Sequence, residues 1–400
     1  MFDDTTTLPR ESYARLFVRF LRFGLLAWGG PVAQIAMIRQ ELVEEERWIS
    51  RERFNRALAV YQALPGPEAH ELCVYFGMIA RGRAGAALAG LGFMLPGFVL
   101  MFALSWWYVT AGIGSAAFAA VFRGMQPAVG ALIVRAIQRI GQHALTDGWL
   151  WGIAGAAGIA ELLGAPFLLT LGLAGFAYLL YKRHRPALAL ALGSLFLLVT
   201  LIAWPNPAGV DRLAGRAPDD LSPPMRPSLP TLFGAGLRTG LLTFGGAYTA
   251  IPFLQHDAVE AGRWMTNDQF LDGLALSGIL PAPLIIFATF VGYLGGGPPG
   301  ALALTAGVFL PAFAFTLIGY GYLERLIRNT SLHAFLDGLT AGVVGLIAAT
   351  ALGLLRATLT DLPAWGVFGL ALLVLHRWKA KAAVAGVMLG AGGLGLLLFS

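Results

Sequence analysis

Two kinds of helix breaker recur at matching places in this sequence and could bind an anion. Glycine pairs interrupt two apolar runs, and Pro-x-Pro motifs open the apolar runs that follow. A helix that begins after such a break leaves its first N–H groups unpaired, and the helix dipole adds positive potential there. Four such helix ends could surround one oxyanion. The breakers are Gly29, Gly30 and Pro31; Pro65, Gly66 and Pro67; Gly245 and Gly246; and Pro281 and Pro283.

A cluster of titratable residues follows the first Pro-x-Pro motif. Glu68, His70 and Glu71 come directly after Pro67, whereas the matching positions after Pro283 are apolar. Inserting an ionisable side chain at the centre of a membrane helix costs about 2.5 to 3.5 kcal/mol, so such a residue is usually paired or has a function. The cluster favours proton coupling, with Glu68 or Glu71 as the carrier. A polar helix end, hydrated at the membrane surface, is an equally good interpretation.

An anion site also needs a positive side chain near the breaks. We take Arg39, which lies between the first glycine pair and the first Pro-x-Pro motif, as the candidate ligand. Arg123 and Asp337 occupy matching positions further along the chain, and we expect them to form an ion pair between the two halves.

The elements that position these residues must lie in lipid. Hydrophobic residues make up 57% of the 400 residues, a further 52 residues are glycine, and 12% are charged, against about 25% in soluble proteins. The net charge is +6, but the basic residues form no block with interleaved aromatics, so the sequence gives no sign of nucleic-acid binding. One cysteine, Cys73, excludes an intrachain disulfide and a cysteine-based metal cluster. Because the first fourteen residues are polar, we expect no cleavable signal peptide.

The chain contains one unit of about 200 residues twice. Residues 24–54 align without a gap on residues 240–270, and the identities include both glycine pairs. Helix breakers that recur at matching positions of both repeats are less easily explained as ordinary turns than a single breaker would be. We predict a first repeat at 1–185, a connecting membrane segment with a proline-rich linker at 186–230, and a second repeat at 231–400.

The apolar runs predict an all-α integral membrane protein with about 10 to 13 membrane segments. They form two inverted structural repeats of about six helical segments each, and basic loops on opposite sides of matching hairpins support the inversion. The same charge bias places the N-terminus in the cytoplasm. Residues 39–56 resist this assignment, because their five Arg and five Glu would face outside. Broken or re-entrant helices would remove the conflict.

Several function classes are not indicated by any motif. No Walker A, HExxH or GxSxG sequence is present, and the six histidines are scattered, so we predict no ATP-driven pump, no metal and no cofactor. Inverted repeats with broken helices are typical of secondary transporters. An intramembrane enzyme that uses Glu68, His70 and Glu71 is a remote alternative, because no catalytic partner stands out on another span.

Paired motifs resemble those of the chromate ion transporter family in its long, two-domain bacterial form. They are WGGPVAQIAMI, RWIS, LPGPEAHELCVYFG and GFMLPGF in the first half, and TFGGAYTAIPFL, RWMT, LSGILPAPLIIFATFVGY and VFLPAF in the second. The resemblance covers nearly the whole chain and implies export of chromate, with chromate resistance, through the motif residues named above. Two departures stand out: Pro-Ala-Pro replaces Pro-Gly-Pro at 281–283, and His70 stands where the family pattern implies a neutral polar residue.

We therefore predict secondary active efflux of chromate, coupled to protons, by a multi-pass protein of the bacterial inner membrane. Its partners would be the anion, protons and the lipid bilayer, and a homodimer is compatible with the sequence. Sulfate or a related oxyanion is the alternative substrate, since sulfate is nearly isosteric with chromate.

Overall fold

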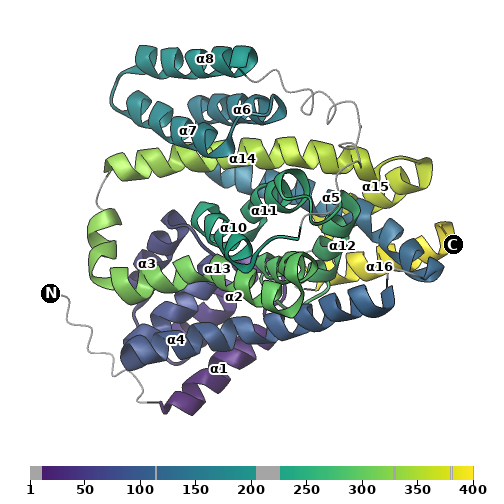
Figure 1. Cartoon of the computed structure of the whole chain (residues 1–400). Coiled ribbons are helices and arrows are strands. Elements are labelled where there is room, and N and C mark those ends of the chain that lie inside the picture. Colours follow the sequence, from purple (N-terminus) through teal and green to yellow (C-terminus); the bar gives the residue numbers. More distant parts are fainter. Residues whose placement is uncertain are drawn as a thin grey trace.

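The computed structural model describes residues 11–112, 115–203, 226–327, 330–378, 380 and 382–399, and every regular element in these ranges is a helix (Figure 1). The first half contains α1 (Tyr13–Leu25), α2 (Gly30–Arg39), η1 (Gln40–Glu45), α3 (Arg51–Ala63), α4 (Glu68–Trp107), η2 (Tyr108–Gly112), α5 (Ala116–Ala144), α6 (Gly148–Leu162), α7 (Phe167–Lys182) and α8 (Pro186–Ala203). The second half contains α10 (Leu229–Leu242), η3 (Ala247–Thr249), α11 (Ala250–Gln255), η4 (His256–Ala261), α12 (Asn267–Gly278), η5 (Leu284–Phe287), α13 (Ala288–Ile327), α14 (Thr330–Thr358), α15 (Leu362–Arg377) and α16 (Ala383–Leu398).

Matching sequences in the two halves adopt the same unusual backbone geometry. Arg81 and Gly82 break α4 with φ/ψ of −145°/24° and 61°/−154°. Gly296 and Gly297 break α13 with −151°/22° and 61°/−153°. Glycine accepts the positive φ at the second position of each break without steric cost. The inversion of the halves across a membrane and the domain boundaries stay predictions.

At these breaks α4 and α13 each fold back on themselves. The backbone of Gly77 touches that of Gly85 across the first turn, and Gly292 touches Gly300 across the second. A Cβ atom on any of these four glycines would collide with the opposing carbonyl oxygen. The part of α4 before its turn, residues 68–80, is only about 20 Å long, which is shorter than the hydrocarbon core of a bilayer, about 30 Å.

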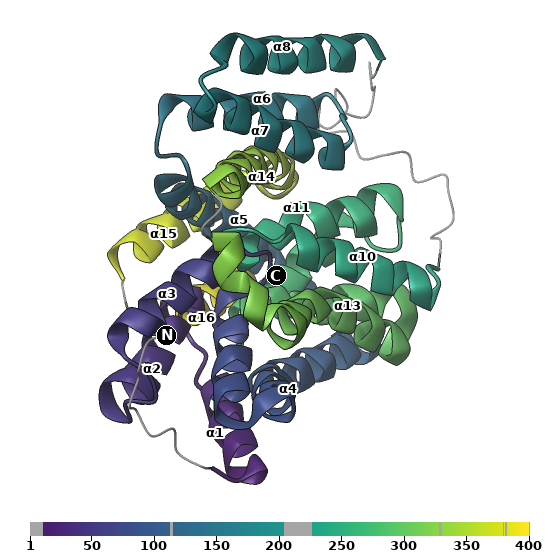
Figure 2. The ribbon, with the colours of Figure 1, turned by 90° about the vertical axis from the view of Figure 1, so that its left-hand side faces the viewer.

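Two long helices are exchanged between the halves. α5, from the first half, packs against α15 and α16 of the second, while α14, from the second half, packs against α6 and α7 of the first. Figure 1 shows α14 beneath the layers formed by α6, α7 and α8, and Figure 2 shows the same stack from the side. The matching glycines Gly124 and Gly338 allow this close packing, because they face the backbones of α16 and α7.

Alanine in place of Gly124 or Gly338 is expected to destabilise the folded protein. The new methyl group at Gly338 would lie 2.5 Å from the carbonyl oxygen of Ala174, and Gly124 faces that of Ala391 in the same way. Overpacking of this kind costs about 1 to 3 kcal/mol. Thermal unfolding of the purified protein in detergent should therefore occur at a lower temperature. Gly152→Ala is the control, because its Cβ would meet nothing within 4 Å; equal midpoints for all three variants would contradict the close packing.

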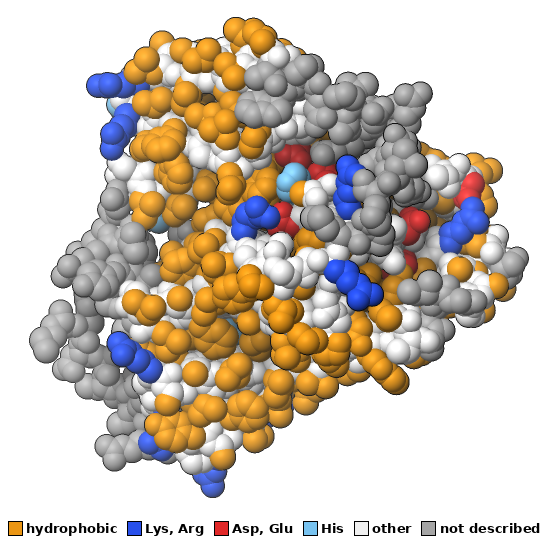
Figure 3. All heavy atoms as spheres, in the orientation of Figure 1, with side chains coloured by type: hydrophobic (Ala, Val, Ile, Leu, Met, Phe, Trp, Pro, Cys, Tyr) orange, Lys and Arg blue, Asp and Glu red, His pale blue; other side chains and the backbone are white. Residues whose placement is uncertain are grey.

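The described helices confirm an integral membrane protein. Four segments are long and apolar enough to cross a membrane: Glu68–Thr110, Ala116–Ala144, Leu284–Gly319 and Thr330–Thr358. Four shorter apolar helices accompany them: Phe167–Lys182, Pro186–Ile202, Leu362–Arg377 and Ala383–Leu398. Figure 3 shows hydrophobic side chains over most of the described surface in that view, with Lys and Arg at separate places. The number of crossings stays a prediction.

Candidate functional site

Each half begins with two helical hairpins, and the breakers form their tips. We call Gly29–Gly30 and Gly245–Gly246 the first and second glycine tips, and Pro65–Pro67 and Pro281–Pro283 the first and second proline tips. Each glycine tip joins the first helix of its half to the next, and each proline tip joins the third to the start of the fourth. The breakers therefore lie at the turns of hairpins.

In the first hairpin the return helix lies beside α1. Arg19 donates a hydrogen bond of 2.8 Å to Glu41, and Arg22 also pairs with Glu41. Arg81 donates to the carbonyl oxygen of Glu11 at 2.6 Å, so the turn of α4 lies at the same end. Residues 39–56 thus return toward the end where α1 begins, and a re-entrant path through the membrane stays a prediction.

The charges at this end, which we call the base, form a network. Arg51 and Arg39 hydrogen-bond to Glu44 with distances of 2.7 and 3.1 Å. These two hydrogen bonds, from Arg51 first and then Arg39, lower the pKa of the Glu44 carboxyl below its ordinary value, although desolvation opposes them. The guanidinium of Arg39 also lies 5.8 Å from the ring centre of Phe54. The described contacts of Arg39 are thus with Glu44 and Phe54 of its own hairpins, and none of them joins Arg39 to a glycine tip or a proline tip.

The hairpin with the first proline tip is closed by aromatic contacts. The rings of Tyr61 and Tyr75 are 6.0 Å apart, and those of Phe54 and Phe76 are 6.3 Å apart. The hairpin with the second proline tip is closed in the same way, by Phe270 against Phe287 and by a hydrogen bond from Ser277 to the carbonyl of Leu284; those distances are 5.3 and 3.0 Å. Both proline tips are therefore held in place by packing behind them.

Each proline tip packs against a helix of the opposite half, next to a proline. Gly66 faces Ala312 of α13, and Ala282 faces Gly97 of α4. Each contact thus pairs one glycine with one alanine, in opposite order. This exchange explains why the second tip can contain Pro-Ala-Pro: the methyl group of Ala282 fills space that glycine leaves on α4.

Two tips from different halves meet at one place. The N–H of Gly66 donates a hydrogen bond of 2.8 Å to the carbonyl oxygen of Thr243, at the end of α10. Gly245, two residues later, lies against Ile140 of α5 and Thr340 of α14. Gly245 and Gly246 have φ of 77° and 116°, which favour glycine. The first proline tip and the second glycine tip thus face each other beside the two exchanged helices.

Two arginines of α5 lie at this meeting point. Arg135 and Arg139 both act electrostatically on Tyr248, and Arg139 also acts on Glu68. Spaced by four residues, they share one face of α5, and neither forms an ion pair with another described residue. Because Gly246 and Pro67 begin helices without a side-chain cap, two helix ends and two cations converge. The tip site comprises Gly66, Glu68, Arg135, Arg139, Gly245, Gly246 and Tyr248.

Sequence reasoning missed these arginines. The spacing of Arg135 and Arg139 by four residues on an apolar helix was the signal that could have found them. The described contacts do not bring the first glycine tip to the tip site: Gly30 has open space around it, and the nearby Gln34 donates a hydrogen bond of 2.9 Å to the carbonyl of Ala27.

The titratable cluster divides into three environments. Glu68 is half-buried and hydrogen-bonds to Gln62. Glu71 is fully buried beside Gly66, and neither oxygen has a hydrogen-bond partner among the described residues. His70 is fully buried among three phenylalanine rings, with Phe313 4.8 Å away between ring centres. Of these three residues, Glu68 alone is partly open to solvent, and it belongs to the tip site.

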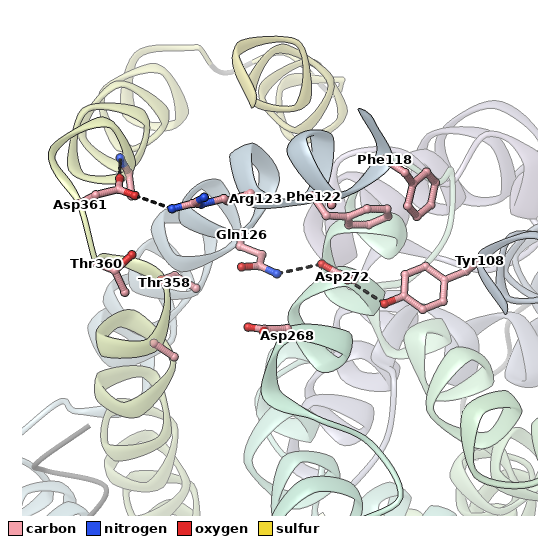
Figure 4. A pocket seen from close by; sticks show the side chains of 13 residues that line it. Tyr108, Phe118, Phe122, Arg123, Gln126, Asp268, Asp272, Thr358, Thr360 and Asp361 are labelled. Carbon is pink, nitrogen blue, oxygen red and sulfur yellow. Dashed lines mark hydrogen bonds and ion pairs between the residues drawn. The ribbon is translucent and has the colours of Figure 1, made fainter. Parts of the chain in front are cut away.

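A second polar region lies where α12 meets α5. Asp272 accepts hydrogen bonds from Tyr108 at 2.8 Å and from Gln126 at 3.0 Å, beside a cavity of about 390 Å³ (Figure 4). Arg123 lines the same cavity and pairs with Asp361 at 3.0 Å. The expected ion pair between Arg123 and Asp337 is therefore wrong: Arg123 sits at the end of α5 that meets the start of α15, and Asp361 caps that helix.

Hairpins with broken tips, packed among long apolar helices, define a multi-pass membrane transporter built around a polar centre. The described residues hold no group of three or more His, Cys, Asp or Glu side chains that could bind a metal. The family model of the chromate transporter matches residues 14–199 and 230–396. The chain belongs to the chromate transporter family, and it is a transporter, not an enzyme.

Relatives from several bacteria are similar over nearly the whole chain. A chromate transport protein of Pseudomonas aeruginosa is 55% identical, covering 98% of this chain and 94% of its own. One from Cupriavidus metallidurans is 30% identical, covering 98% and 95%. A probable chromate transport protein of Synechococcus elongatus is also 30% identical, covering 95% and 96%. No solved structure matches the chain.

Proposed function

We propose that this protein exports chromate across the bacterial inner membrane and thereby confers chromate resistance. The observation that carries the proposal is the tip site, where two arginines without an ion-pair partner in the described part of the chain lie beside two uncapped helix ends. Chromate is a tetrahedral dianion, and two guanidinium groups neutralise its charge while the helix N–H groups provide further donors. The names of the relatives support chromate as the substrate.

Export agrees with the membrane potential. Moving one elementary charge through 100 mV is worth about 2.3 kcal/mol, so a dianion gains about 4.6 kcal/mol per 100 mV when it leaves a cell that is negative inside. The orientation follows from the base, whose arginines include Arg15, Arg19, Arg22 and Arg81; we place this end and the N-terminus in the cytoplasm.

Glu71 is proposed to hold the coupled proton. An ionised carboxylate buried without a partner is costly, and it would repel an anion at the neighbouring Gly66. Protonation of Glu71 and anion binding therefore favour each other, so the proton moves in the same direction as the anion. In this scheme one net negative charge leaves per cycle, and the membrane potential drives transport.

Radiolabelled chromate uptake into everted vesicles tests the function, since uptake there corresponds to export from the cell. We expect uptake when the interior is positive, loss of uptake when the potential is collapsed, and proton uptake that accompanies chromate. Uptake no greater than in vesicles without the protein would refute chromate transport. Uptake that is indifferent to the potential would refute the driving force.

Sulfate, added as an unlabelled competitor, tests the alternative substrate. Chromate and sulfate share charge and shape, so some competition is expected. Half-inhibition by sulfate at a concentration below that of chromate, together with uptake of radiolabelled sulfate, would reassign the physiological substrate while leaving the anion site in place.

Glu71→Gln is expected to separate chromate transport from protons. Glutamine has nearly the same shape and stays neutral, so chromate uptake should continue while its pH dependence and the accompanying proton uptake disappear. The measurement is uptake over a range of alkaline pH, where chromate itself stays a dianion, with a pH-sensitive dye inside the vesicles. Glu52→Gln is the matched control, because Glu52 is exposed on α3. A pH dependence equal to that of the wild type would remove Glu71 from the proton pathway.

A further inference from the structure

Matching faces of α3 and α12 have opposite exposure. On α3, four positions on one side of the helix are exposed: Asn55, Arg56, Ala59 and Gln62. On α12, the four matching positions are buried: Leu271, Asp272, Ala275 and Gly278. The two helices have the same place in their hairpins, so the difference lies in what covers them.

The buried face of α12 is covered by the exchanged helix α5 and by α16, which belongs to the same half as α12. α12 packs against α5 and α16, and Asp272 is held there by Tyr108 and Gln126. α3 packs against η1, α4 and α13, and among the described contacts it has no comparable packing with α14 or α7, the counterparts of α5 and α16. One hairpin is docked and its counterpart is not.

The undocked face leads to the tip site. It runs along α3 from the base to Gln62, which hydrogen-bonds to Glu68. Arg139, on the facing side of the tip site, is also exposed. Exposed side chains therefore extend along α3 from the base toward the tip site, while the matching face of α12 is buried.

Charged residues at matching positions of the two hairpins and their facing helices have opposite signs. At the docked face, Asp272 of α12 and Arg123 of α5 line one cavity (Figure 4). The matching residues are Arg56 of α3 and Asp337 of α14, and both are exposed. Docking of α3 onto α14 would bring the positive Arg56 near the negative Asp337, at the positions that match Asp272 and Arg123 on the cavity between α12 and α5.

We propose that the structure is open toward the base and closed by α12, and that transport alternates which of the two hairpins is docked. In the alternate state α3 docks onto α14, with Arg56 beside Thr340 and Asp337, while α12 leaves α5 and the bonds of Asp272 with Tyr108 and Gln126 break. The tip site then opens on the side opposite the base. The assignment rests on the proposed transport function and names its gates.

Two cysteine pairs test this exchange in the full chain after Cys73→Ala. Gln126→Cys with Asp272→Cys reports the docked α12, and Arg56→Cys with Thr340→Cys reports a docked α3. In vesicles oxidised without chromate, we expect the first pair to link and the second to remain largely free. With chromate and a membrane potential, the second pair should link, and each link should abolish uptake in proportion to the linked fraction until it is reduced.

Failure of the exchange and failure of the function give different results. A second pair that never links during turnover, or a linked first pair that leaves uptake unchanged, would overturn the exchange. If the disulfide links form as expected but neither the wild type nor any variant transports chromate, the result supports the alternating docking of α3 and α12. It refutes chromate as the substrate.

A charge swap gives an independent readout. Arg56→Asp places two negative residues at the α3 gate and should slow chromate uptake by about 10-fold, and Asp337→Arg in the same chain should restore most of it. A merely structural role for Arg56 would not be rescued from α14. Equal defects in the single and double variants would overturn the pairing of these residues.

Discussion

Replacing Arg135 and Arg139 together with glutamine is expected to reduce chromate uptake by about 100-fold or more. A hydrogen bond to a charged group contributes about 1.5 to 3 kcal/mol, and the variant removes two such groups from the tip site. The loss should appear mainly in KM, because the arginines bind the anion in its ground state. Initial uptake rates over a range of chromate concentrations in everted vesicles, normalised to the amount of protein in the membrane, provide the measurement.

Arg39→Gln is the matched control, because Arg39 is engaged with Glu44 and Phe54. We expect its KM to stay within about twofold of the wild type, as a surface ion pair contributes about 0 to 1 kcal/mol. The opposite pattern, a large effect at Arg39 and none at the two arginines of α5, would move the anion from the tip site to the base.

Gly97→Ala is expected to impair both stability and transport, and Ala282→Gly is expected to rescue it. A methyl group on Gly97 would lie 2.7 Å from the Cβ of Ala282, an overpacking that costs about 1 to 3 kcal/mol. Removing the methyl group of Ala282 recreates the arrangement at the other proline tip, where Gly66 faces Ala312. A double-mutant cycle on the unfolding temperature and on chromate uptake measures the coupling.

The cycle separates packing at the tip from general damage to α4. If the defects of Gly97→Ala and Ala282→Gly simply add, the two residues do not meet and the tip packs elsewhere. A rescue of stability without a rescue of uptake would show that the exact position of the second proline tip matters for transport beyond its packing.

Much of the fold follows from local rules that a sequence displays. Glycines such as Gly82 and Gly297 must adopt a positive φ, and the repeat places each one at the same point of its half. The helical fold, the helix breaks and the correspondence of each break in the first half with one in the second were therefore predictable. The helices that pack against α5 and α14 were not predictable, because the apolar residues of a helix face do not specify which distant helix will cover that face.

The candidate site was predictable in part for the same reason. The breakers at Gly66 and Gly245 stand out locally, but their meeting through Thr243 depends on tertiary packing between halves. Arg139 does not stand out in the sequence, because an arginine near the end of an apolar run is commonly a topology signal. Arg39 was chosen for its position in the sequence between two breaks, whereas its pairing with Glu44 required the folded hairpin.

The exchange of α5 and α14 also has a consequence for biogenesis. α5 ends at Ala144, but α15 and α16, which cover it, begin more than 200 residues later, at Leu362 and Ala383. During synthesis the glycine surface of α5 therefore enters the bilayer before its final neighbours exist, and its native packing is completed only after the second half has been synthesised. Two separate half-length chains could make the same contacts only by intertwining, and a single fused polypeptide ensures that each α5 finds its α16 in a one-to-one ratio.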